Sequence, residues 1–189
     1  MRDRKFGIVL AVIGLMMILS AMLVLVHNYN ENKIISHKSQ QVLSKLKEAN
    51  FEQIITNDSK EQVFSVDGYE YIGYIDIPQI KVRLPVLSQW DYTGLKLAPC
   101  RQFGKADTND LVIAAHNYKC HFGNISKLNI GSSVNFTDAC NYTHSYKVEQ
   151  IKTLNPTDVE NVQNSKYDLV LYTCNYSGKK RIAVFCNHQ

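Results

Sequence analysis

The segment from Phe6 to Val26 constrains the fold of this chain most strongly, because its 21 residues contain no charged side chain. A helix rises about 1.5 Å per residue, so a segment of this length covers the hydrocarbon core of a bilayer, which is about 30 Å thick. A cleaved signal peptide would have a shorter apolar region followed by small residues spaced as A-x-A, and neither feature is present. The sequence therefore predicts a membrane-spanning helix over residues 6–26. A buried core helix is the alternative, although a soluble helix of this length normally has a polar face.

The charges on either side of this segment predict its orientation. Arg2, Arg4 and Lys5 precede it, whereas residues 27–31 contain no Lys or Arg. Positively charged flanks favour the cytoplasmic side of a membrane. We therefore expect a single-pass protein of the cell membrane with a cytoplasmic N-terminus, in which everything after about residue 27 is extracellular.

The length and composition predict one compact domain beyond the membrane segment. The chain has 189 residues and is 45% apolar, which suffices for one domain of roughly 100 to 150 residues plus an appendage. Of the net charge of +4, residues 2–5 supply +2. The remaining excess of positive charge is too small to indicate a nucleic-acid partner.

A polar segment connects the apolar helix to this domain. Residues 31–57 are rich in Lys, Gln and Glu, and their apolar residues recur at spacings of one helical stripe: Ile35, Val42, Leu46 and Ile54. The pattern predicts a helical stalk, with a disordered linker as the alternative. We accordingly divide the chain into a cytoplasmic tip and membrane anchor (1–27), a stalk or linker (28–66) and a globular domain (67–189).

From Tyr69 onward the periodicity changes from helical to strand-like. Short apolar or alternating runs are separated by clusters of Gly, Asn, Asp and Pro, and a helix is expected to start near Asn155, capped by Thr157 or Asp158. Many short strands with few helices favour a closed or nearly closed β-barrel over alternating βαβ units. The expected strands cover residues 69–77, 82–87, 111–115, 133–137, 146–153, 168–173 and 181–185.

The last two expected strands form a hairpin that contains a candidate nucleophile. If the turn is centred on Ser177 and Gly178, the numbers of paired residues add up to 355, so Cys174 faces Arg181. Directly opposed side chains share a face, with Cβ atoms about 4.5 to 5.5 Å apart. The same register places Cys186 on the opposite face, which disfavours a disulfide between the two cysteines. Cys174 is then available to react, although cysteine is also among the most commonly buried residues.

A general base is the other group that such chemistry needs. Of the six histidines, His116 alone directly follows a continuous apolar strand, LVIAAH, and it precedes a loop. A strand end fixes the position of a side chain, and a loop gives substrates access to it. His116 is therefore the candidate base, and a structural histidine at a strand end is the alternative.

The remaining cysteines and histidines leave two questions open. Five cysteines in an exported domain indicate possible disulfides, and an odd number leaves at least one thiol; Cys120 and Cys140 are either bridged or two thiols. The chain lacks the paired C-x2-C or H-x3-H spacing of structural zinc sites, which disfavours zinc. The residues considered for zinc are Cys120, His121, Cys140, His144, Cys186 and His188.

Taken together, residues 69–186 resemble the sortases, the membrane-anchored cysteine transpeptidases of Gram-positive bacteria. The family signature T-L-x-T-C followed by an arginine reads here as V-L-Y-T-C over residues 170–174, followed by Arg181. Val170 departs from the first threonine of the signature. VIAAHNY around His116, HFGNISKLNIGSSVNF after it and YIGYIDIPQIKVRLPVL upstream extend the resemblance.

The resemblance implies a sortase-type eight-stranded β-barrel with short helices. His116 would follow the fourth strand, Cys174 would end the seventh and Arg181 would lie on the eighth. In this family the cysteine thiolate attacks the Thr-Gly carbonyl of a C-terminal sorting signal on a surface protein, and the histidine protonates the leaving amine. Arg181 would position the substrate and stabilise the oxyanion, and Thr173 would line the substrate-binding site.

The resemblance also implies partners and a subclass. The thioester on Cys174 would pass to an amine of a cell-wall precursor or a pilin, or slowly to water. The short spacing between Cys174 and Arg181 and the helix before the barrel resemble class B, with class D as the alternative. The sequence contains no obvious aromatic-anchored lid, which argues against class C. The calcium-binding acidic positions of some class A members have no clear match, so we expect no metal and no cofactor. An exported cysteine hydrolase or protease and a non-enzymatic cell-surface binding module are the alternative functions.

Overall fold

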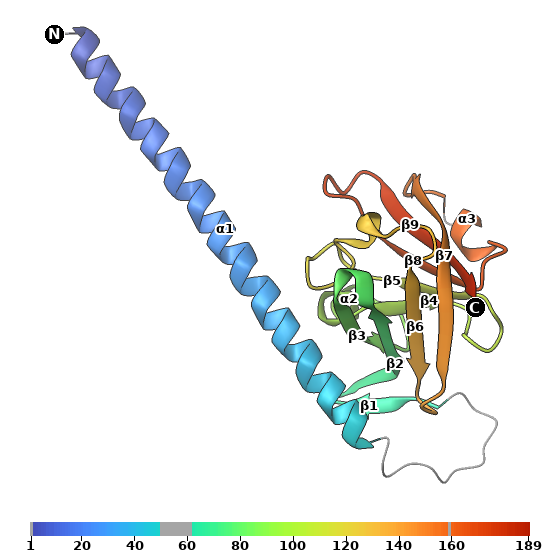
Figure 1. Cartoon of the computed structure of the whole chain (residues 1–189). Coiled ribbons are helices and arrows are strands. Elements are labelled where there is room, and N and C mark those ends of the chain that lie inside the picture. Colours follow the sequence, from blue (N-terminus) through green and yellow to red (C-terminus); the bar gives the residue numbers. More distant parts are fainter. Residues whose placement is uncertain (1, 50–61, 159) are drawn as a thin grey trace. The chain divides into compact units, whose positions relative to one another are not determined.

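The computed structural model describes residues 2–49, 62–158 and 160–189, and the chain forms two compact units, residues 1–34 and 35–189. The first unit is part of helix α1 (Arg2–Ala49), which is drawn in blue in Figure 1. Its apolar side chains from Phe6 to Val26 are exposed. By length and composition this helix is able to cross a membrane.

The C-terminal part of α1 belongs to the second unit and packs there through its apolar stripe. Ile35, Leu43 and Leu46 are buried, and Val42 contacts the same apolar cluster as Leu46. The helix predicted from residue 31 is thus confirmed up to Ala49. Residues 50–61, which include Ile54, lie outside the described residues.

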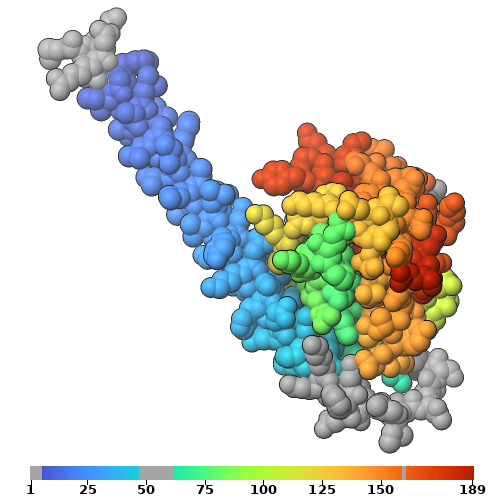
Figure 2. Space-filling model, viewed as in Figure 1, coloured from blue at the N-terminus to red at the C-terminus, as the bar shows by residue number. Residues whose placement is uncertain are grey.

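Among the described residues, eight strands form a closed barrel, which confirms the predicted fold (Figure 1). Neighbours around the barrel follow the order β2-β3-β4-β5-β8-β9-β7-β6, and β6 pairs with β2 to close it. The strands are β2 (Tyr69–Ile77), β3 (Val82–Leu87), β4 (Cys100–Phe103), β5 (Leu111–Ala114), β6 (Ser133–Asp138), β7 (Thr143–Leu154), β8 (Leu169–Cys174) and β9 (Arg181–His188). The paired strands β6 and β7 lie on the face of the domain seen in Figure 2.

The barrel is mixed, because two of its neighbouring pairs are parallel. Strand β3 pairs in parallel with β4, and β5 pairs in parallel with β8. The other barrel pairs are antiparallel. Since parallel strands end at the same edge of a sheet, β5 and β8 deliver the residues that follow them to one place.

Alternation along the strands fills the barrel with apolar side chains. Ile75, Ile113, Leu171 and Val184 come from four different strands and are fully buried in one core cluster. Cys186 belongs to the same cluster, on the face of β9 opposite to Arg181. This arrangement agrees with the strand pattern predicted from the sequence.

All seven expected strands are present, and the structure adds elements that the sequence did not predict. Strand β1 (Phe64–Val66) pairs with β2 and lies within the segment assigned to the stalk or linker. Strand β4 and helix α2 (Tyr92–Leu97) were also not expected. These elements have three to six residues, too few to establish a periodicity.

The remaining elements are single helical turns. They are α3 (Glu160–Gln163), η1 (Pro78–Ile80) and η2 (Ile125–Lys127). Helix α3 is the one expected near Asn155, and the Asp158 carboxylate accepts a hydrogen bond from the Asn155 backbone N–H at 2.8 Å. Asp158 therefore stabilises the turn that leads into α3.

The closure of the barrel depends on Gly73. This residue has φ +145° at an irregularity of β2 and pairs with Asp138 of β6. Residues other than glycine rarely adopt this backbone φ, and a Cβ atom at position 73 would collide with the Thr137 carbonyl oxygen. Strand β6 can approach β2 this closely only because residue 73 has no side chain.

We expect Gly73→Ala to lower the free energy of unfolding by about 3 kcal/mol or more, because it combines backbone strain with a collision against a strand. Gly131→Ala is the matched control, since Gly131 also has a positive φ (+83°) but nothing lies near its Cβ position. The control should lose only about 1 kcal/mol. Urea denaturation of the two variants measures the difference, and equal losses would contradict the role given to Gly73.

Candidate active site

His116 and Cys174 follow the ends of two neighbouring parallel strands. Ala114 of β5 is paired with Tyr172 of β8, and the Ala115 N–H donates to the Tyr172 carbonyl at 3.1 Å. His116 and Cys174 are each two residues beyond the paired positions. Because neighbouring strands are about 4.8 Å apart, this register brings the imidazole and the thiol to one edge of the barrel.

Two side-chain hydrogen bonds fasten the segments that carry these groups. The buried Thr173 hydroxyl donates to the Ala115 carbonyl at 2.7 Å. The Asn117 side-chain amide donates to the Asn175 carbonyl at 3.2 Å. The residues on both sides of Cys174 are thus bonded to residues next to His116.

The hairpin register predicted from the sequence is confirmed. Cys174 is paired with Arg181 across β8 and β9. Arg181 Nη1 donates to the carbonyl oxygens of Gly178 at 3.1 Å and Lys180 at 3.3 Å. The turn therefore holds one end of the guanidinium, while Nε and Nη2 can still donate to a substrate.

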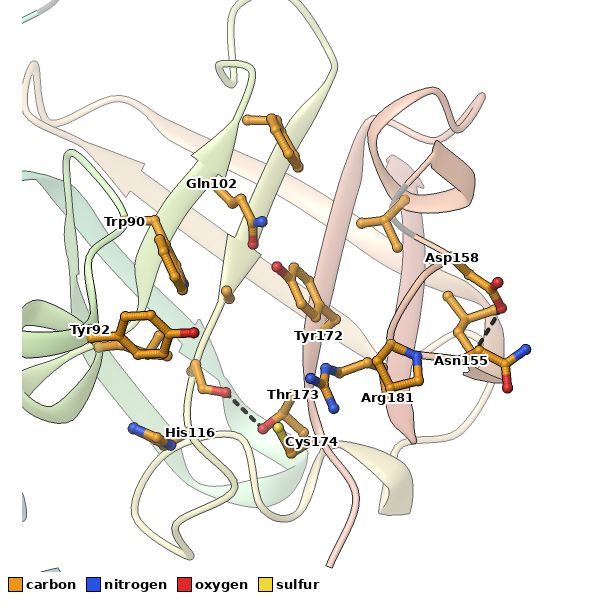
Figure 3. A pocket seen from close by; sticks show the side chains of 17 residues that line it. Trp90, Tyr92, Gln102, His116, Asn155, Asp158, Tyr172, Thr173, Cys174 and Arg181 are labelled. Carbon is orange, nitrogen blue, oxygen red and sulfur yellow. Dashed lines mark hydrogen bonds between the residues drawn. The ribbon is translucent and has the colours of Figure 1, made fainter. Parts of the chain in front are cut away.

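The three side chains line one pocket of about 290 Å³. Figure 3 shows the Cys174 side chain between the His116 ring and the Arg181 guanidinium. All three side chains are half-buried. The pocket lining also includes apolar and aromatic side chains, among them Trp90, Tyr92, Phe103, Leu154 and Val162. A thiol, an imidazole and a guanidinium beside an apolar groove can act on a peptide carbonyl.

Comparison with known proteins identifies the family. Residues 75–189, more than half of the chain, match the family described as Sortase, sortase domain. The chain belongs to the sortase family. Sortases are cysteine transpeptidases that anchor proteins bearing a sorting signal, so this chain is an enzyme of that kind.

Solved sortases share the fold of this domain. The chain is similar to sortase C1 from Streptococcus suis, with 27% identity, a TM-score of 0.56 and coverage of 64% of this chain and 74% of that one. It is also similar to the sortase D5 transpeptidase from Clostridium perfringens (20% identity, TM-score 0.59, coverage 83% and 99%). A third is sortase C from Clostridium perfringens with the C-terminal cell wall sorting motif (22% identity, TM-score 0.57, coverage 82% and 89%). No curated protein matches the chain.

Tyr172 lies in the sortase pocket two residues before Cys174. Burial raises the pKa of its hydroxyl to about 12, although the nearby Arg181 guanidinium lowers it. The hydroxyl therefore stays protonated at neutral pH. It offers a neutral hydrogen-bonding group on the pocket wall.

The His116 ring has aromatic neighbours in the loop that follows it. Its centroid lies 4.9 Å from that of Tyr118, which in turn lies 5.6 Å from that of His121. His121 is fully buried, and burial lowers its pKa to about 4. His121 is therefore neutral at physiological pH and packs as part of the core.

The pocket contains residues that the sequence did not single out. Trp90 and Tyr92 lie at the start of α2, and Gln102 and Phe103 lie on β4. Asp91 accepts hydrogen bonds from the N–H groups of Thr93 and Gly94, so an N-cap signal for α2 was present in the sequence. No comparable signal marks β4.

The other sortase cysteines lie outside the pocket, and the described residues contain no disulfide bond. Cys100 and Cys186 are fully buried, and burial raises the pKa of each thiol to about 12. Cys140 is the exposed one of these cysteines. The pKa of its thiol is raised, first by the loss of some solvent around it and then by the nearby carboxylates of Asp138 and Asp107. Among these thiols, Cys174 alone stands beside a cation in a pocket.

One group of side chains in the described residues could hold a metal ion. Ligand atoms of Asp107, Asp138 and His144 lie within 4.8 Å of one another. His144 Nε2 is 3.0 Å from Asp138 Oδ2, and Asp138 Oδ1 accepts the N–H groups of Cys140 and Tyr142. Asp138 is thus already engaged by the turn between β6 and β7, and a histidine–aspartate pair accounts for this geometry.

We expect brief treatment with iodoacetamide at neutral pH to alkylate Cys174 and to spare Cys100 and Cys186. The two buried thiols are shielded and, with a pKa of about 12, almost wholly protonated, whereas the thiolate is the reactive form. Peptide mass spectrometry locates the label, and urea-unfolded protein serves as the control in which all the cysteines react. Labelling of Cys186 ahead of Cys174 in the native protein would contradict the assignment.

Proposed function

We propose that Cys174 is the nucleophile of this sortase, that His116 is its acid and base, and that Arg181 binds the reacting carbonyl. The observation that supports this most strongly is that all three side chains line one pocket at one edge of the barrel. The register of β5 and β8 and that of β8 and β9 fix their positions independently.

The reaction proceeds in two acyl transfers. The Cys174 thiolate adds to the carbonyl carbon of the Thr-Gly bond in a sorting signal, the C–N bond breaks, and protonated His116 gives its proton to the leaving amine. The product is a thioester on Cys174. An acceptor amine then adds to the thioester carbonyl, neutral His116 takes the proton of that amine, and the thiolate leaves. Water in place of the amine gives hydrolysis.

Arg181 and Thr173 assist at the carbonyl. The turn carbonyls hold Nη1 of Arg181, which orients the guanidinium while Nε and Nη2 donate to the carbonyl oxygen as it becomes negatively charged. Thr173 lines the pocket beside Cys174, and its hydroxyl is bonded to the Ala115 carbonyl. Because Thr173 is almost fully buried, its contribution to substrate binding is through the position that it gives to the neighbouring thiol.

The substrate is a surface protein with a C-terminal sorting signal, and the acceptor is an amine of a cell-wall precursor or a pilin. The similarity to a sortase C solved with a sorting motif supports this kind of substrate. The chain is anchored in the cell membrane by residues 6–26, with the N-terminus in the cytoplasm. Residues 28–66 form the stalk or linker, and residues 67–189 form the extracellular catalytic domain.

For the subclass we propose a class B-like enzyme, with class D as the alternative. The short spacing of Cys174 and Arg181, which are seven positions apart, and the helix that precedes the barrel support this proposal. Similarity at 20 to 27% identity extends to the fold, and it does not distinguish between classes.

We expect the full chain in detergent to convert a sorting-signal peptide and an amine such as oligoglycine into an amide product. A panel of peptides is assayed by chromatography with and without the amine. The product should require the amine and disappear in Cys174→Ala, whereas Cys140→Ala, which changes an exposed thiol outside the pocket, should leave the rate within about twofold. Equal turnover with water alone would indicate the hydrolase alternative, and no Cys174-dependent product would indicate the binding module.

We expect Arg181→Lys to lower kcat/KM by at least ~100-fold, because an ammonium cannot reproduce the guanidinium fork at the oxyanion. The melting temperature should stay within about 2 °C, since Arg181 is only partly buried. Arg83→Lys is the matched control: Arg83 lies on β3 outside the pocket, where it pairs with Asp76 at 2.8 Å. Near-normal turnover of Arg181→Lys would contradict the role given to this residue.

A further inference from the structure

The apolar cluster that receives helix α1 also supports one wall of the active-site pocket. Leu46 of α1 packs in this cluster together with Leu87 and Cys100. Leu95 of α2 packs against the same cluster and also lines the pocket that contains Cys174. One set of apolar side chains therefore lies between helix α1 and the pocket.

Helix α2 depends on this cluster because it is too short to be stable by itself. It has six residues, and an isolated helix of that length does not persist in water. It connects β3 to the parallel strand β4, and its buried Gly94 is so close to Leu87 that an added Cβ would lie 2.9 Å from Leu87 Cδ1. Apart from the cap at Asp91, the packing of α2 on the cluster thus determines where Tyr92 lies.

Trp90 and Tyr92 form an aromatic wall of the pocket at the start of α2. Their ring centroids are 4.9 Å apart in an edge-to-face arrangement. Figure 3 shows both side chains on the side of the pocket away from Arg181. Tyr92 is 75% exposed and Trp90 is 38% exposed, so few contacts of their own restrain them. A displacement of α2 would therefore change the surface that binds the substrate, whereas the pairing of β5 with β8 would keep the reacting groups in place.

Helix α1 contains a second buried leucine, which lies outside this cluster. Leu43 is 4% exposed and Leu46 is 1% exposed, so both side chains are removed from water. Among the described residues, the cluster includes Leu46 and is contacted by Val42, but it does not include Leu43. Both leucines hold α1 on the domain, and only Leu46 shares a cluster with α2. The two contributions can therefore be separated by mutation.

We propose that Leu46 is a positioning residue for substrate binding. By filling the cluster on which Leu95 packs, it holds α2 and the aromatic wall of Trp90 and Tyr92 in the position that binds the substrate. The inference rests on the proposed active site and goes beyond it, because it couples the packing of helix α1 to the affinity of the pocket. When the contact at Leu46 is lost, the substrate binds more weakly, but the bound substrate reacts at the normal rate.

The kinetic test uses the full chain in detergent, with oligoglycine and a sorting-signal peptide that the wild type converts. Leu46→Ala should raise KM by about fivefold or more, which is the lower end of typical coupling between two sites, and should leave kcat within about twofold. Leu43→Ala is the matched control, because it removes the same atoms from a buried position of the same helix, and its KM should stay within about twofold of the wild-type value. Leu46→Met keeps the volume and should restore the wild-type KM.

A spectroscopic test needs no substrate. Trp90 is the only tryptophan in the chain, so its fluorescence reports on the start of α2. In Leu46→Ala the emission should shift to longer wavelength, and acrylamide should quench it more readily than in the wild type. Leu43→Ala should match the wild type in both measurements. The melting temperature should fall to a similar extent in the two variants, since each leaves a cavity of similar size. If Leu46→Ala does not fold, Leu46→Val removes less volume and provides the same comparison.

The outcomes separate this role from a purely structural one. An unchanged KM in Leu46→Ala, an equal rise of KM in both alanine variants, or Trp90 emission that does not change in Leu46→Ala would overturn the inference while the proposed function stands. If the wild type converts no peptide and forms no thioester on Cys174, as judged by intact mass, the proposed function fails. The fluorescence comparison then still decides whether Leu46 positions α2.

Discussion

The parallel pairing of β5 with β8 is the constraint on which the site depends. An antiparallel pair would place the residues after these strands at opposite edges of the sheet, about one strand length apart. The parallel pair places His116 and Cys174 side by side, and the bond from Thr173 to the Ala115 carbonyl extends the contact beyond the last pair of the ladder. The intervening strands β6 and β7 complete the other side of the barrel before the chain returns. One topological choice thus closes the core and brings the imidazole to the thiol.

The remaining residues of the pocket come from shorter structural elements next to this edge of the barrel. A tight hairpin supplies Arg181, and its own turn carbonyls orient the guanidinium. A bulge supplies Gln102, and a short capped helix supplies Tyr92. The parallel strands therefore position His116 and Cys174, whereas the hairpin, the bulge and the short helix supply other residues that line the pocket. This division fits an enzyme family in which one chemistry serves many sorting signals.

Most of the barrel, and the core of the site, could be predicted from the sequence because both follow from short-range patterns. Short apolar or alternating runs indicated seven strands, and the register of one turn placed Cys174 opposite Arg181. His116 stood out through the apolar run before it. What the sequence did not contain was any local signal for pairing between distant segments. The bond from Asn117 to Asn175 and the bulge at Gln102 each depend on which strand lies alongside, which a single sequence does not express.

The central claim is that the thiol of Cys174 and the imidazole of His116 lie within reach of one another. A three-carbon reagent with two alkylating ends, such as 1,3-dibromoacetone, tests this directly on the native protein, since the first end reacts with the thiol and the second only with a nucleophile a few ångströms away. Digestion and mass spectrometry should recover one cross-linked product that joins the peptides of Cys174 and His116. Recovery of Cys174 modified at one end only, or bridged to any other side chain, would contradict the account.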